Sequence, residues 1–126
     1  MIVNLVYVAL GGGLGAVLRY LTFLGAGRWL GGGYPWATLT VNVVGSLLMG
    51  LLVGWLMRRG GTGEHLRLFL GVGLLGGFTT FSAFSLDFAL LWQRGDTGTA
   101  LGYALISMAA SIAALFAGLA LMRAGA

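Results

Sequence analysis

The residues of this chain that could do chemistry are hydrogen-bond donors set within long apolar segments. The stretch "GGFTTFSAFS", residues 76–85, holds two glycines, two threonines and two serines among three phenylalanines. Two further segments carry donor side chains at intervals of four residues, a spacing that places them on one face of a helix. They are Thr38, Asn42 and Ser46, and Tyr103, Ser107 and Ser111. Because these faces carry no carboxylate, the pattern favours a pathway for an anion over one for a cation.

Asn42 and the phenylalanines each have two interpretations. Asn42 has two N–H donors and one acceptor, so it either links helices or donates to a passing anion. Phe81, Phe84 and Phe88 form a stripe with helical spacing. Such a stripe is typical of core packing, but the positive edge of an aromatic ring can also support an anion.

The glycines and hydroxyls before this stripe predict a break in the helix. Gly76 and Gly77 weaken the helix, and Thr79, Thr80 and Ser82 can bond the backbone groups that a break sets free. Irregular backbone at membrane depth is tolerated where protein or a cavity covers it. Carbonyl groups freed by a break can also hold a cation.

Two charged residues, Arg19 and Asp87, fall within apolar segments. Arg19 either extends to the membrane interface or attracts an anion to a vestibule. Asp87 is expected to face an aqueous mouth or an arginine. A small multidrug or cation transporter, the first alternative, would need a carboxylate at mid-membrane in its first helix, where this chain has Arg19.

Composition assigns the chain to membrane proteins. Of its 126 residues, 59% are hydrophobic and 8% are charged, whereas soluble domains have about 25% charged residues. The chain has no cysteine, one histidine, and no catalytic dyad, phosphate loop or metal-ligand cluster, so we expect no enzyme activity. Its net charge of +4 comes from arginines scattered between apolar runs, which indicates loop ends and not a nucleic-acid surface.

Four segments are long enough to cross a bilayer, which takes roughly 20 apolar residues. They are residues 2–24, 34–57, 66–92 and 98–122. Membrane spans are helical because lipid satisfies no backbone groups, so we predict an all-α single domain over 1–126 with both termini on one side. Glycine pairs four residues apart indicate tightly packed helices. These pairs are Gly11 and Gly15, Gly50 and Gly54, and Gly73 and Gly77.

The arginines leave the orientation open. Those at the termini and the second loop slightly outnumber those of the first and third loops. The positive-inside rule orients helices by such differences. A small difference is either noise or a sign that the chain inserts both ways, and dual insertion would allow an antiparallel dimer.

The chain resembles the Fluc family of small fluoride channels, the CrcB-like proteins. The motifs that carry the resemblance are "GGGLGAVLRY" at 11–20, "TLTVNVVGS" at 38–46 and "GGFTTFSAFS" at 76–85. The resemblance implies an antiparallel homodimer of dual topology in the cell (inner) membrane, with two pores that passively export fluoride. It also implies that the breaks of the two third helices cross at the dimer centre around a structural sodium ion.

The resemblance further implies roles for individual residues. Backbone carbonyls of Gly76 and Thr79 would bind the sodium ion. The other predicted site residues belong to the anion pathway: Phe81, Phe84, Asn42, Thr80, Ser82, Tyr103, Ser107, Ser111, Thr38, Asp87 and Arg19. Phe81 and Phe84 would line the pores, and Asn42 would be the pore asparagine. Tyr103, Ser107 and Ser111 would form a hydroxyl track, with Thr38 and Asp87 near its entrance, and Arg19 would be the first-helix arginine.

The chain departs from the family pattern at a few positions. Ala83 stands where members usually have threonine, so a hydroxyl beside the pore is missing. Ala37 and Leu47 replace a usual glycine and phenylalanine and leave the donors intact. The second alternative, a membrane scaffold without transport, explains the glycines but not three donor faces in register.

Overall fold

The computed structural model describes residues 1–31, 33–60 and 63–125, and in these residues all regular structure is helical. Four segments are long and apolar enough to cross a membrane, which confirms the predicted fold class. Three are single helices: α1 (Ile2–Trp29), α2 (Trp36–Arg58) and α6 (Thr97–Ala124). The third segment along the chain, which we call the compound helix, is made of α3 (Glu64–Leu66), the π-helix η1 (Arg67–Leu75), α4 (Gly76–Phe78) and α5 (Phe81–Gln93).

The first, third and fourth helical segments extend beyond the predicted bounds, whereas α2 begins two residues later than the predicted residue 34. The glycine-rich stretch after residue 24 stays helical to Trp29, because a helix satisfies its own backbone groups and glycine is tolerated in membrane helices. Pro35 lies just before α2, which begins at Trp36. The π-helix η1 was not predicted at all; its i→i+5 turns are wider than those of an α-helix.

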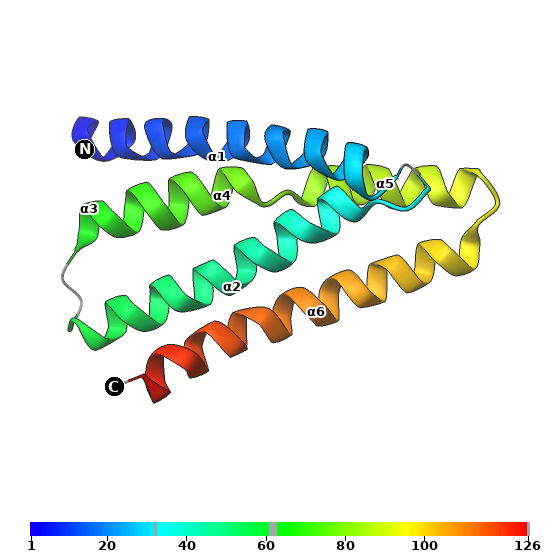
Figure 1. Ribbon diagram of the computed structural model, residues 1–126. Helices are drawn as coiled ribbons and strands as arrows, with labels where there is room; N and C mark the ends of the chain where they lie inside the picture. Colours follow the sequence, from blue (N-terminus) through cyan, green and yellow to red (C-terminus); the bar gives the residue numbers. More distant parts are fainter. Residues whose placement is uncertain (32, 61–62, 126) are drawn as a thin grey trace.

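The four segments pair in a simple order. The first helix, α1, lies along η1 and α4; α2 packs along α6 and also touches the compound helix; α5 meets α6 (Figure 1). Both termini lie at the same end of the molecule (Figure 1). The outer faces carry exposed apolar side chains, for example Leu21 of α1 and Phe116 of α6, as expected for surfaces in contact with lipid.

Glycines set the spacing of both main helix pairs. A Cβ atom added to Gly15 would lie 2.8 Å from the Phe78 nitrogen, and one added to Gly118 would lie 2.7 Å from the Leu51 nitrogen. A Cβ added to Gly50 would collide with the Leu115 carbonyl oxygen. Real Cβ atoms do not approach backbone this closely, so the spaced glycines do serve the close helix packing predicted from the sequence.

Candidate functional site

The helical hydrogen bonding of the compound helix is interrupted between α4 and α5. The last α4 residue is Phe78, and the next two residues, Thr79 and Thr80, have extended backbone with ψ of 158° and 123°. Thr80 is the N-cap of α5, because its Oγ1 accepts a hydrogen bond from the Ala83 N–H at 3.1 Å. We call residues 76–80 the helix break.

Two side-chain oxygens at the break accept N–H groups that a continuous helix would use. The Thr80 N–H donates to Asn42 Oδ1 at 2.8 Å, and the Ala83 N–H donates to Thr80 Oγ1 at 3.1 Å. In an α-helix each N–H bonds to the carbonyl four residues earlier. The carbonyls of Gly76 and Thr79 therefore lose their usual helical donors. These are the two carbonyls that the resemblance assigns to sodium.

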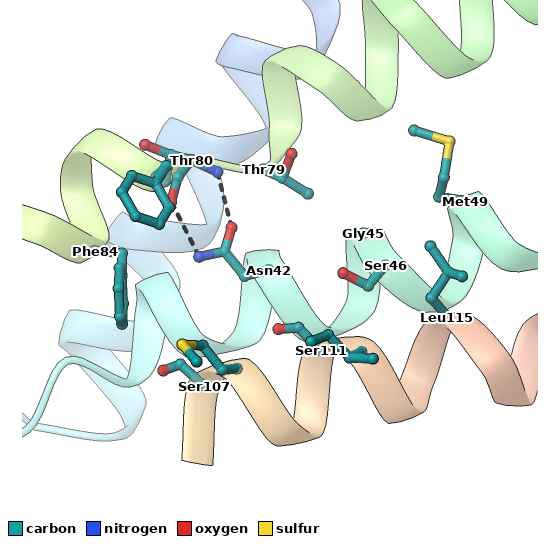
Figure 2. Close-up of a pocket in the computed structure, with 13 residues that line it drawn as sticks. Asn42, Gly45, Ser46, Met49, Thr79, Thr80, Phe84, Ser107, Ser111 and Leu115 are labelled. Carbon is teal, nitrogen blue, oxygen red and sulfur yellow. Dashed lines mark hydrogen bonds between the residues drawn. The ribbon is translucent and has the colours of Figure 1, made fainter. Parts of the chain in front are cut away.

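Asn42 joins α2 to the break through both ends of its amide. Besides accepting from Thr80, it donates from Nδ2 to the Thr80 carbonyl at 3.0 Å (Figure 2). An asparagine amide has two N–H donors, so one remains for another acceptor. Of the two interpretations of Asn42, the structure shows the interhelical link and leaves a donor for the other.

Next to the break, α2 and α6 border a groove of about 430 Å³ (Figure 2). Seven of the predicted site residues line this groove: Asn42, Thr79, Thr80, Phe81, Phe84, Ser107 and Ser111. Ser46, which shares the predicted donor face of Thr38 and Asn42, also lines the groove. The sequence did not predict the remaining lining residues: Gly45, Met49, Met108, Ile112 and Leu115. The methionines carry no donor signal that could have placed them here.

Two hydroxyls of the groove have no hydrogen-bond partner. The Oγ atoms of Ser107 and Ser111 are buried and unpaired within the part of the chain that the structure describes. An unpaired buried polar group costs about 1–3 kcal/mol, and such a group in a native structure calls for an explanation. An acceptor that enters the groove would provide one.

A chain of aromatic rings runs from the groove towards α6. The ring centroids of Phe81 and Phe84 are 5.4 Å apart, and those of Phe84 and Tyr103 are 5.3 Å apart. Phe81 is 76% exposed, whereas Tyr103 is fully buried. Phe84 and Phe88 of the stripe pack against the buried cluster of Leu91, Ala100 and Tyr103, whereas Phe81 lies exposed at the groove.

A second group of predicted residues meets nearer to the loops. Asp87 Oδ2 accepts hydrogen bonds from the Thr38 hydroxyl at 2.5 Å and from the Tyr103 hydroxyl at 3.2 Å. Thr38 is buried, at 2% exposure. Asp87 also lines a pocket of about 140 Å³ with the Gly33–Pro35 segment and Arg94, and we call this pocket the mouth.

Charged and aromatic side chains surround this mouth. Arg94 pairs with Asp96 at 3.2 Å and donates to the Gly33 carbonyl at 3.3 Å. Burial raises the pKa of the Tyr34 phenol above its ordinary value. Its ring meets the Tyr103 ring edge-on at 5.6 Å between centroids.

Three predicted residues lie outside the groove and the mouth. Arg19 is on α1, lines neither pocket, and has no hydrogen bond or ion pair among the described residues. Ser82 is exposed, with its Oγ 3.2 Å from Thr80 Oγ1. Gly76 contributes to the break through its backbone and not to the groove lining.

These features define a small multi-pass membrane protein with a largely apolar groove that holds several hydrogen-bond donors beside a broken helical segment. Residues 6–119 match the family described as "CrcB-like protein, Camphor Resistance (CrcB)". A relative from Mesorhizobium japonicum, named "Fluoride-specific ion channel FluC", is 58% identical over 120 residues, which cover 95% of this chain and 96% of the relative. A relative of the same name from Rhodospirillum centenum is 60% identical over 116 residues, with 92% of each chain covered.

A third relative, from Novosphingobium aromaticivorans, has the same name and is 59% identical over 119 residues, which cover 93% of this chain and 94% of the relative. The chain belongs to the CrcB-like family. This confirms the resemblance drawn from the three motifs. It also confirms that the chain is not an enzyme, because its family is one of ion channels.

Proposed function

We propose that this protein is a passive fluoride channel. The observation that carries the proposal is the pair of buried, unpaired hydroxyls of Ser107 and Ser111, which face one groove with the spare N–H of Asn42. Such donors suit an anion that must lose water to pass. The fluoride identity is supported by the names of the relatives.

The residues of the groove can replace the hydration shell of a small anion. Fluoride is strongly hydrated, so its passage needs several close donors, which Asn42, Ser107 and Ser111 supply. The ring edges of Phe81 and Phe84 carry partial positive charge and add to them. A larger anion that meets these donors poorly would leave them unpaired, which disfavours its entry.

The direction of transport follows from acid–base chemistry and the membrane potential. Hydrogen fluoride enters a bacterial or archaeal cell as a neutral weak acid and dissociates there. The inside-negative potential then drives the anion outwards through the channel. In this scheme Thr38, Tyr103 and Asp87 form the entrance of each pathway in the cell membrane, and Arg19 attracts anions from α1.

The working unit in our proposal is an antiparallel homodimer with two pores. The groove is open to one side, and Phe81 at its edge is 76% exposed, so a second copy is needed to close the pathway. The nearly balanced arginines at the two ends of the helices allow opposite insertion of the two copies.

A sodium ion fits the helix break. The carbonyls of Gly76 and Thr79 lack their helical donors because Asn42 Oδ1 and Thr80 Oγ1 have taken those N–H groups. Freed carbonyl oxygens are suitable ligands for Na⁺. Bound between two chains, the ion would hold both breaks together by attraction to these oxygens.

The serines allow the channel to be distinguished from a scaffold. We expect Ser107→Ala and Ser111→Ala each to leave the free energy of unfolding unchanged or to raise it by about 0.5–1 kcal/mol, since each removes an unpaired buried hydroxyl. Each should slow fluoride efflux about tenfold, because one donor worth roughly 1.4 kcal/mol is lost. Unfolding in detergent and efflux from liposomes measure the two effects.

Ser85→Ala is the matched control, because Ser85 lies on α5, is exposed and does not line the groove. It should change neither quantity. If the groove variants lost stability while fluoride efflux stayed at the wild-type rate, the serines would be packing residues and the anion pathway would lie elsewhere.

A further inference from the structure

The buried position of Thr80 makes its N–H group depend on Asn42. Thr80 is 7% exposed, and its N–H donates to Asn42 Oδ1 at 2.8 Å. A buried N–H group that loses its acceptor must find another. Thr79 and Thr80 are extended; if they became helical, the acceptor would be the carbonyl four residues earlier, which belongs to Gly76.

A glycine on α2 lets the break come close enough for this contact. Gly45 lies one turn after Asn42, and a Cβ added to it would collide with the Thr79 methyl group and lie 3.4 Å from the Phe78 ring. The break therefore packs directly against α2. Asn42 of α2 bonds to the Thr80 backbone through both its acceptor and its donor.

We propose that Asn42 is a positioning residue for the cation site, in addition to being a donor in the groove. Its Oδ1 holds the Thr80 N–H, which keeps that N–H from bonding to the Gly76 carbonyl and leaves the carbonyl available to Na⁺. The inference rests on the proposed sodium site and assigns to one side chain a role in both the cation site and the anion groove.

The experiment compares Asn42→Ala, Asn42→Asp and Ser46→Ala with the wild-type dimer in detergent. Thermal unfolding is followed while NaCl is replaced by N-methylglucamine chloride at constant ionic strength, which yields the Na⁺ concentration of half-maximal stabilisation. Ser46→Ala is the matched control, since Ser46 is one turn further along α2 and lines the same groove without a bond to the break. Fluoride efflux from liposomes is measured on the same samples.

We expect Asn42→Ala to raise the half-maximal Na⁺ concentration at least about tenfold, because the Gly76 carbonyl then accepts the Thr80 N–H. Asn42→Asp retains an oxygen for the Thr80 N–H but loses the amide donors. Its Na⁺ requirement should stay within about threefold of the wild type while its fluoride efflux falls at least about tenfold. Ser46→Ala should keep the wild-type Na⁺ requirement.

The positioning role is overturned if wild-type stability does not depend on Na⁺, or if folded Asn42→Ala keeps the wild-type Na⁺ requirement. It is also overturned if Asn42→Asp raises that requirement at least about tenfold, a test that remains even if Asn42→Ala does not fold. These results are independent of transport. A wild-type protein that needs Na⁺ but passes no fluoride would refute the channel and leave the role of Asn42 standing.

Discussion

Gly15→Ala is expected to lower the free energy of unfolding by about 3 kcal/mol, the upper end of the range for overpacked sites. The added Cβ would collide with the Leu74 carbonyl and lie 2.8 Å from the Phe78 nitrogen. Backbone atoms cannot move aside as a flexible side chain can, so α1 must separate from the compound helix. Thermal or denaturant unfolding in detergent, together with the yield of monodisperse protein, measures the effect.

Gly13→Ala is the matched control for this prediction. Gly13 is exposed on the same helix, and a Cβ added there has nothing within 4 Å. Alanine also favours the helical state over glycine by about 1 kcal/mol, so this variant should be as stable as the wild type or more so. Equal stability of the two variants would show that α1 and the compound helix are not packed as closely as described here.

Phe81→Ile is expected to slow fluoride efflux at least about tenfold, equivalent to about 1.4 kcal/mol. Isoleucine retains apolar bulk but has no ring edge to offer to an anion. Because Phe81 is 76% exposed in the single chain, its replacement should change the stability of that chain little. Efflux from liposomes and unfolding in detergent separate the two effects.

Phe116→Ile tests whether the loss is specific to the groove. Phe116 is a 63% exposed ring on α6 that lines neither pocket, so its replacement should leave efflux unchanged. If Phe81→Ile conducted fluoride at the wild-type rate, the aromatic stripe would have no part in the pathway, and the donors of Asn42, Ser107 and Ser111 would have to act alone.

Much of the fold follows from the sequence because a bilayer restricts what a chain can do. Four apolar segments of sufficient length must form helices, and spaced glycines such as Gly50 and Gly54 allow close packing. The ends of the helices were less predictable, as α1 shows by continuing to Trp29. The turn and charge signals after residue 24 suggested a loop, whereas an intact helix leaves fewer backbone groups unsatisfied.

Several predicted site residues lie together in the structure, but their hydrogen bonds were not predictable. Asn42 and Ser107, which four-residue spacing assigned to the donor faces of two helices, line the same groove. The sequence could not reveal that Asn42 takes the Thr80 N–H, because that bond depends on how closely α2 approaches the break. The π-helix η1, which packs along α1, has no signal in the sequence that distinguishes it from an α-helix.

The central claim is tested most directly by anion efflux from liposomes reconstituted with the purified protein. Vesicles loaded with potassium fluoride or, separately, potassium chloride are diluted into potassium-free medium. Valinomycin then carries potassium out of the vesicles, which balances the charge of the leaving anion. Our account predicts rapid loss of fluoride with chloride retained. Well-folded protein that releases neither anion, or releases both equally, would contradict a fluoride channel built on this groove.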